Sequence, residues 1–254
     1  MDRLAFISLA GITSQTDIRA KITNSLANVS TTGFKESLAT VDESLATNGL
    51  GFDTRVAPSR PSQEYINLAP GTINTTGRAM DIAMSGSTVL GVQAANGDIG
   101  FTRRGDLRVT ANGLIENAAG QLVMGEAGPI NVPPGHIVSI SPDGTLFGTL
   151  PTEPDAPALN LGQLMLRDAS QTQLIRRSDA LFEPADEALR GADFPNGPEP
   201  VAVTSGALEG SNVNPIEAMV KLMDFSRSYE AKIKLVSEIK AIDENGSSMM
   251  RLPK

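Results

Sequence analysis

The sequence predicts an α+β protein in which long N- and C-terminal helices form a coiled-coil-like layer beside a central antiparallel all-β domain. Apolar residues recur at helical spacing at both ends of the 254-residue chain. Between these ends the repeat becomes that of short strands, separated by turn dipeptides such as Asn96-Gly97 and Asn112-Gly113. The two ends are also nearly neutral, whereas the middle of the chain is acidic.

The first predicted helix runs from about Asp2 to Val29, and Asp2 is a suitable N-cap. The run from Asn28 to Gly33 combines β-branched and cap-forming residues, which we expect to end the helix. Its apolar or small residues follow a helical repeat. They are Leu4, Ile7, Gly11, Ile18, Ile22, Leu26 and Val29.

The middle of the chain predicts an antiparallel β domain of barrel or sandwich type. Short runs of strand-forming residues recur every 8 to 12 residues or so and are bounded by turn residues. The predicted strands are Asp81–Met84, Thr88–Gln93, Ile99–Arg103, Leu107–Thr110, Leu114–Glu116, Gln121–Met124, Ile137–Ile140, Thr145–Thr149, Leu161–Arg167, Gln173–Arg176 and Ala180–Phe182. Residues 33–76 show little periodicity, and their conformation stays open at this point.

The last predicted helix begins at Asn214-Pro215-Ile216-Glu217, where a capping side chain precedes proline at the first helical position. It is expected to end at Asn245-Gly246. A seam with steps of three and four residues is widened by neighbouring apolar residues, so we expect more than one neighbour to bury this face. The seam is Ala218, Leu222, Phe225, Tyr229, Lys232, Val236, Ile239 and Asp243, widened by Met219, Met223, Ile233 and Ile242.

These elements divide the chain into three predicted regions. Residues 1–30 together with 214–254 form a terminal helical assembly domain. Residues 31–76 form an extended linker that contacts neighbouring subunits, and residues 77–213 form a β-rich outer domain. The net charge of −8 lies in the middle, because residues 1–29 hold three basic and two acidic residues and residues 214–254 hold seven and six. Nearly neutral apolar ends can pack against further copies while an acidic body stays solvated.

Composition excludes several classes of function. A net charge of −8 argues against nucleic acid as a partner. No apolar run approaches the roughly 18 residues of a membrane span, so we expect no membrane insertion. Polar residues interrupt the N-terminal apolar positions, so we also expect no cleaved signal peptide.

The residues needed for most catalytic centres are missing. The chain has no cysteine and a single histidine, His136, in a Pro-Pro-Gly-His turn. We therefore expect no catalytic residues, no cofactor and no metal site. Paired carboxylates of a carbohydrate-active enzyme are the remaining alternative, but no pattern singles out a pair. The acidic residues weighed for it are Asp106, Glu116, Glu126 and Asp143.

Three ordered motifs carry a family resemblance. The run from Asn24 to Lys35 reads N-S-L-A-N-V-S-T-T-G-F-K, and Ser211-Asn212-Val213-Asn214 leads into the last helix, followed by Arg227-Ser228-Tyr229-Glu230. The sequence resembles the rod and hook proteins of the bacterial flagellum over nearly its whole length. Its middle motifs, which fall in the expected order, are Met80-Asp81-Ile82-Ala83, Phe101-Thr102-Arg103-Arg104-Gly105 and Asp143-Gly144-Thr145.

The resemblance is closer to proximal-rod than to distal-rod members, because of Gly125–Ile130 and Leu208–Val213. It implies a structural protein, not an enzyme, that self-assembles through its terminal helices into the torque-transmitting shaft of the basal body across the periplasm. The implied partners are other copies, other proximal-rod proteins, the distal-rod protein and the flagellar type III export apparatus. A distal-rod subunit is the nearest alternative, and a secreted carbohydrate-active β protein is a more distant one.

The helical spacing of apolar residues and the family resemblance together predict an assembly interface at both ends of the chain. We expect these residues to contact neighbouring subunits. They are Leu4, Ile18, Ile22, Leu26, Asn28, Gly33, Phe34, Asn212, Asn214, Leu222, Phe225, Tyr229, Val236 and Ile239.

Overall fold

The computed structural model describes residues 16, 18–39, 42–44, 48–49, 52–53, 59–61, 64–152 and 157–249. These residues fall into two compact units, each formed from separate stretches of chain. The helical unit comprises residues 1–27, 39–63 and 214–254, and the β unit comprises residues 28–38 and 64–213. Asp2 and Leu4, which belong to the predicted first helix, lie outside the described residues.

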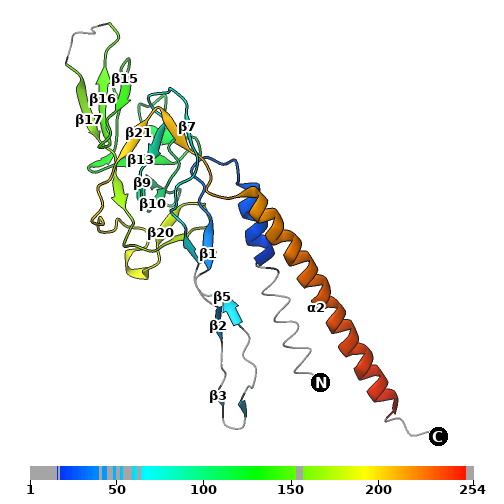
Figure 1. Ribbon diagram of the computed structural model, residues 1–254. Coiled ribbons are helices and arrows are strands. Elements are labelled where there is room, and N and C mark those ends of the chain that lie inside the picture. The colour runs from blue at the N-terminus through cyan, green and yellow to red at the C-terminus, as the bar shows by residue number, and fades with distance from the viewer. Residues whose placement is uncertain are drawn as a thin grey trace. The chain divides into compact units, whose positions relative to one another are not determined.

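The β unit is a set of short antiparallel strands around one main sheet (Figure 1). Nine strands form this sheet in the order β11-β12-β13-β9-β10-β20-β19, with β14 paired to β13 and β18 to β9. The strands that begin this unit are β1 (Ser37–Ala39), β6 (Glu64–Ile66), β7 (Ile73–Thr75), β8 (Ile82–Met84), β9 (Thr88–Gln93), β10 (Ile99–Thr102), β11 (Leu107–Val109), β12 (Ile115–Asn117), β13 (Leu122–Gly125) and β14 (Gly128–Pro129). The remaining elements are β15 (Ile137–Ile140), β16 (Thr145–Thr149), β17 (Leu159–Gln163), β18 (Leu166–Asp168), β19 (Leu174–Arg176), β20 (Phe182–Pro184), the 3-10 helix η1 (Glu187–Leu189), β21 (Val203–Ser205) and β22 (Ala207–Glu209).

Strand β9 is the centre of the main sheet and is buried from Thr88 to Val92. A strand covered on both faces carries a nearly continuous apolar run rather than a strict alternation, and Val89-Leu90-Gly91-Val92 fits this rule. One core cluster includes Leu90, Leu107 and Leu146, and a second surrounds Phe101 and Phe182. Phe101 and Phe194 meet edge to face, with ring centroids 4.6 Å apart.

Smaller sheets complete the β unit. Strands β15, β16 and β17 form a separate three-stranded sheet, while β21 pairs with β8 and β22 pairs with β7. The hairpin turns predicted at Asn96-Gly97 and Asn112-Gly113 are present, with glycine φ angles of 90° and 80° that a residue with a Cβ rarely adopts. Residues 33–76, whose conformation the sequence left open, contribute β1, β6 and β7 to this unit.

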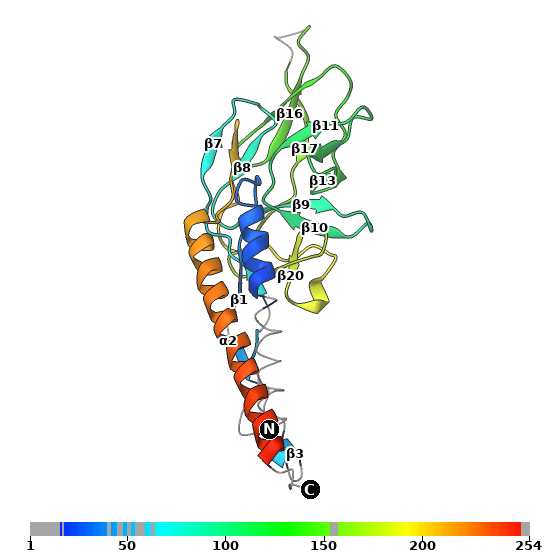
Figure 2. The same ribbon diagram turned by 90° about the vertical axis from the view of Figure 1, so that its right-hand side faces the viewer.

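Among the described residues, the helical unit contains one long helix, α2 (Pro215–Met249, 35 residues). Residues 18–27 are helical and lie beside the first turns of α2 in both views (Figures 1 and 2). Four short strands pair in this unit, β2 with β5 and β3 with β4. They are β2 (Asp42–Ser44), β3 (Asn48–Gly49), β4 (Phe52–Asp53) and β5 (Ser59–Pro61).

The predicted fold class is wrong. The described chain is mostly β with one long helix, and no coiled-coil-like layer of two long helices is found among the described residues. A coiled coil needs apolar contacts sustained along two helices for several heptads. The ten helical residues 18–27 span only about 15 Å, whereas α2 spans about 52 Å at 1.5 Å per residue. The predicted C-cap at Asn245-Gly246 is also wrong, because α2 continues to Met249.

Candidate assembly site

The start of α2 is built as the sequence predicts. The Asn214 side-chain oxygen accepts hydrogen bonds from the backbone N–H groups of Ile216 at 3.0 Å and Glu217 at 3.4 Å. Pro215 occupies the first helical position, where its missing N–H leaves no donor unpaired. Glu217 forms an ion pair with Lys221 one turn later, with a nitrogen–oxygen distance of 2.8 Å.

The predicted seam of α2 occupies its less exposed side. Ala218 is buried, and Leu222, Phe225, Tyr229 and Val236 are half-buried. The rings of Phe225 and Tyr229 stack with centroids 5.8 Å apart. The side chain of Ile239 lies outside the described residues, as does the whole of Leu4.

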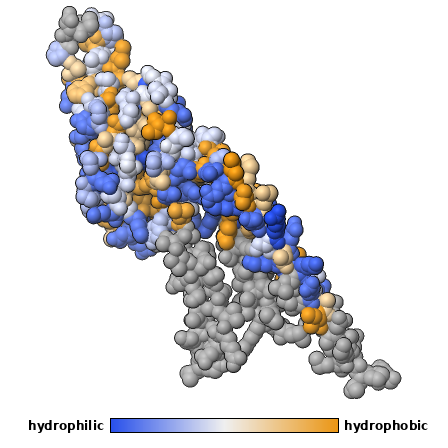
Figure 3. Space-filling model, in the orientation of Figure 1, coloured by the Kyte–Doolittle hydropathy of each residue, from blue (hydrophilic) through white to orange (hydrophobic). Residues whose placement is uncertain are grey.

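A second apolar stripe lies on the opposite side of the first turns of α2. At 100° per residue, Ile216, Met219, Val220 and Met223 cluster roughly 150° around the helix from the seam. Their exposed fractions are 74%, 53%, 45% and 54%. Figure 3 shows apolar surface among charged surface along this helix. Adjacent exposed apolar side chains of this kind are typical of interaction sites in soluble proteins.

Sequence reasoning found only part of this exposed stripe. The sequence predicts Met219 and Met223 only as a widening of the seam, and it does not single out Ile216 and Val220. Their spacing of three and four residues was the available signal, but spacing does not say which of two apolar faces is covered. Among the N-terminal residues, Ile18 is exposed, while Ile22 and Leu26 are half-buried.

The other predicted interface residues belong to the β unit and bond within it. Asn28 accepts a hydrogen bond from the Thr31 hydroxyl at 3.1 Å. The Gly33 N–H donates to the carbonyl of Glu209 at 2.7 Å, and the Asn212 N–H donates to the carbonyl of Phe34 at 3.3 Å. The structure therefore brings Gly33, Phe34 and Asn212 together, across nearly 180 residues of sequence.

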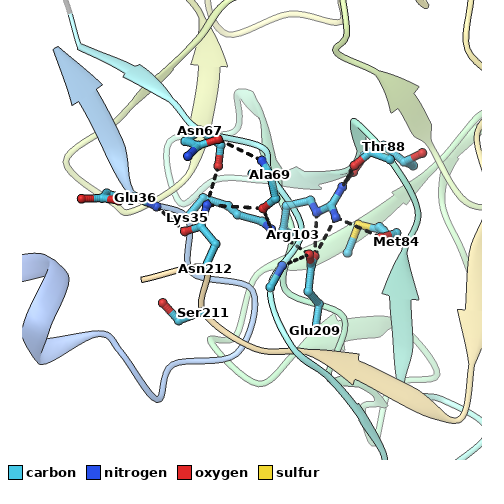
Figure 4. A network of polar contacts seen from close by, with 12 residues as sticks. Lys35, Glu36, Asn67, Ala69, Met84, Thr88, Arg103, Glu209, Ser211 and Asn212 are labelled. Atoms are coloured by element: carbon cyan, nitrogen blue, oxygen red, sulfur yellow. Dashed lines mark hydrogen bonds and ion pairs between the residues drawn. The ribbon is translucent and has the colours of Figure 1, made fainter. Parts of the chain in front are cut away.

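A buried ionic cluster lies next to these contacts (Figure 4). The two carboxylate oxygens of Glu209 are 2.7 Å from Lys35 Nζ and 2.7 Å from an Arg103 guanidinium nitrogen. The side chains are 2%, 0% and 0% exposed, respectively. Burial lowers the pKa of Lys35 below its ordinary value, and the charge of Arg103 acts in the same direction, while the hydrogen bond to Glu209 opposes both. Sequence reasoning missed this cluster, because no local pattern links three charges so far apart.

Cation–π contacts of Arg176 hold the segment of Phe34 and Lys35. The Arg176 guanidinium lies 4.5 Å from the centre of the Phe34 ring and 5.6 Å from that of Phe182. Arg176 also donates a hydrogen bond to the Lys35 carbonyl. Phe34, predicted as an interface residue, is thus half-buried against its own β unit.

The described residues show no group of three or more histidine, cysteine or acidic side chains that could hold a metal ion. Among the described helices, none combines the length and the apolar character that a membrane crossing requires.

Comparison with known proteins identifies the family. Residues 204–250 match the domain described as the C-terminal part of flagellar basal body rod FlgEFG proteins, and residues 83–148 match the FlgE/F/G D1 domain described for the flagellar hook protein. The chain is 34% identical over 249 residues to the flagellar basal-body rod protein FlgF of Salmonella typhimurium, covering 96% of each chain. The chain belongs to the flagellar basal-body rod protein family.

Further relatives agree with this family. The flagellar basal-body rod protein FlgF of Escherichia coli is 32% identical over 256 residues, covering 99% of this chain and 98% of that protein. The FlgG protein of Buchnera aphidicola (subspecies Schizaphis graminum) is 28% identical over 251 residues, with 91% and 94% covered. The resemblance read from the motifs is confirmed, and so is the prediction of a structural rod subunit of the basal body that is not an enzyme.

Proposed function

We propose that this rod-family chain assembles with copies of itself and with other rod proteins through its helical unit, at the proximal end of the rod. The observation that carries this proposal is the exposed apolar stripe of Ile216, Met219, Val220 and Met223. Burying such side chains against a neighbour releases about 25 cal/mol for each Å² of apolar surface. The FlgF relatives, at 34% and 32% identity, support the proximal position over the distal one.

The seam residues are part of the same proposal. Leu222, Phe225, Tyr229 and Val236 are half-buried within one chain, so further contacts can still cover them. The near-neutral ends of the chain favour close packing of copies, because little like charge is brought together. A repeated contact between different surfaces of the same subunit produces an open helical tube.

The proposal also covers how the subunit is exported and where in the cell it acts. A rod subunit reaches its site through the flagellar type III export apparatus and acts in the periplasm as part of the shaft that transmits torque. These steps rest on the family, whose known members are described as basal-body rod proteins.

A charge placed in the exposed stripe tests the proposal. Met223→Asp places a carboxylate at a position that is exposed in the monomer and that assembly would remove from water. Burying this unpaired charge would cost the assembled state several kcal/mol, whereas the exposed charge would cost the monomer little. We expect cells that depend on this variant to lose rods and motility, while the melting temperature of the purified protein stays unchanged.

Ala231→Asp is the matched control, because it adds the same charge to an exposed position of α2 about two turns beyond the stripe. Cells with this variant should keep their rods. Normal rods with Met223→Asp, or the failure of the unaltered chain to restore motility, would refute the proposal.

A further inference from the structure

The chain passes between its two units four times. The passages follow residues 27, 38, 63 and 213. The β unit therefore has three stretches next to these passages: residues 28–38, residues from 64 onward, and residues up to 213. Each residue in a passage has two backbone dihedrals that rotate easily. Passages that are not bonded to one another would therefore move independently.

Hydrogen bonds join the three stretches to one another. Asn212 accepts from the Glu36 N–H through its side-chain oxygen at 2.7 Å and donates from its amide nitrogen to the Asn67 carbonyl at 2.9 Å. The Asn67 N–H donates to the Glu36 carbonyl at 2.8 Å. One side chain, that of Asn212, thus contacts both of the other stretches (Figure 4).

The carboxylate of Glu209 also joins the three stretches, by charge-assisted hydrogen bonds. Its Oε1 accepts from Lys35 Nζ at 2.7 Å and from the Gly71 N–H at 2.9 Å. Lys35 Nζ also donates to the Ala69 carbonyl at 2.7 Å. Charge-assisted hydrogen bonds in a dry environment are short and directional, so they hold the groups in one arrangement.

Glycines allow this close approach. A Cβ on Gly33, whose φ is 68°, would lie 2.5 Å from the carbonyl carbon and oxygen of Arg103. A Cβ on Gly71 would lie 2.3 Å from the carbonyl oxygen of Gly210. Main chain therefore packs directly on main chain where the stretches meet.

Arg103 anchors the cluster in the main sheet. Its Nε donates to Glu209 Oε2 at 2.8 Å, while its terminal nitrogens donate to the carbonyls of Met84, Gly86 and Thr88 at 2.9, 2.7 and 2.7 Å. These carbonyls lie at the end of β8, in the turn after it and at the start of β9. Arg103 thus connects the cluster to the buried centre of the β unit.

We propose that Lys35, Arg103, Glu209 and Asn212 form the mechanical junction of the subunit. In this junction Glu209 is the positioning residue, because its carboxylate holds Lys35, Arg103 and the Gly71 N–H in place. The junction binds the three stretches next to all four passages to one another, so load entering the β unit by any passage is shared by the sheet. This role rests on the proposed function, because only a subunit of a rotating shaft has to carry such load.

Hydrogen exchange on the purified full-length protein tests the junction without relying on that function. Glu209→Gln should speed exchange of the Gly33, Gly71, Gly210 and Asn212 amides by roughly tenfold or more, as expected when a buried cation pair loses its counterion. The amides of β9 and β10 should become faster only by the factor that follows from the fall in the free energy of unfolding. Asp168→Asn is the matched control, since it makes the same change at another buried carboxylate, which accepts from Ser170 and Glu199. No acceleration at the four amides, or the same acceleration of these amides in Asp168→Asn, would overturn the proposal.

Asn212→Ala is the second variant in case Glu209→Gln does not fold, because it breaks the ties to Glu36 and Asn67 without stranding a charge. Cells that carry this variant, or Glu209→Gln if it folds, should build rods but lose swimming speed in viscous medium more than cells with Asp168→Asn. Equal loss in all variants would refute the junction. If the unaltered chain does not restore motility, the proposed function fails, while the exchange result still decides the junction.

Discussion

At the scale of single residues, the unusual feature is a buried cluster whose charges do not balance. Lys35 and Arg103 are fully buried and share one carboxylate, that of Glu209. Backbone carbonyls compensate the excess positive charge, from Ala69 at Lys35 and from three residues at Arg103. The cost of removing a partner therefore depends strongly on which partner is removed.

Glu209→Gln should lower the free energy of unfolding by about 3–5 kcal/mol, because it leaves two cations buried side by side. Lys35→Met should lower it by only about 1–3 kcal/mol, because a one-to-one pair of Glu209 and Arg103 remains. Urea titration of both variants gives the comparison. Equal losses would mean that Lys35 is neutral in the folded protein or that solvent reaches the cluster.

Lys35 should also give stability a specific pH dependence. Burial lowers its pKa below the ordinary value of 10.5, so the folded chain binds fewer protons than the unfolded chain between the two pKa values. The free energy of unfolding of the unaltered chain should therefore rise with pH in that window, which ends near 10.5. Lys35→Met lacks this contribution. Curves for the two proteins that stay parallel up to pH 10.5 would show that the pKa of Lys35 is not lowered.

At the scale of elements, α2 combines a strong local start signal with two apolar faces of different exposure. The cap at Asn214 comes from residues adjacent in the chain, which is why the sequence predicts it well. The faces depend on which neighbours cover them, and local spacing carries no such information. The helix also passes through Gly246, because a single glycine costs a helix only about 1 kcal/mol.

Asn214→Ala should destabilise the start of α2 by about 1 kcal/mol, since two N–H groups lose their acceptor. Hydrogen exchange should become faster at Ile216 and Glu217 while the β unit is unaffected. Asn214→Asp restores an acceptor of the same shape and serves as the control. Unchanged exchange in the alanine variant would show that the cap does not limit opening of the first turn.

At the scale of the whole molecule, the chain forms two units by crossing between them repeatedly. The predicted division into residues 1–30 with 214–254, 31–76 and 77–213 stays a prediction about assembly. The contacts within this chain group residues 28–38 and 64–76 with the β unit, and residues 39–63 with the helical unit. Both core clusters of the β unit lie within the stretch from Ile66 to Val203.

Deletion of residues 215–254 should therefore leave the β unit folded with an unchanged melting temperature, because that core does not use α2. The truncated chain should no longer enter rods in cells. Thermal unfolding followed by near-ultraviolet circular dichroism, together with a motility assay, measures both outcomes. A large fall in melting temperature would mean that α2 completes the core of the β unit.

Most of the short strands and their turns, the start of α2 and the family could be predicted from the amino-acid sequence. These features depend on residues that are close in the chain, such as Asn96-Gly97 and Asn214-Pro215, or on motifs read in order. Three features came from the three-dimensional structure: α2 as the one long helix among the described residues, the covered face of α2, and the bonds of Gly33 and Phe34 to the segment of Glu209 and Asn212. Lys35 and Glu209 are 174 residues apart, so their contact depends on how the strands between them pair, and no local pattern in the sequence predicts it.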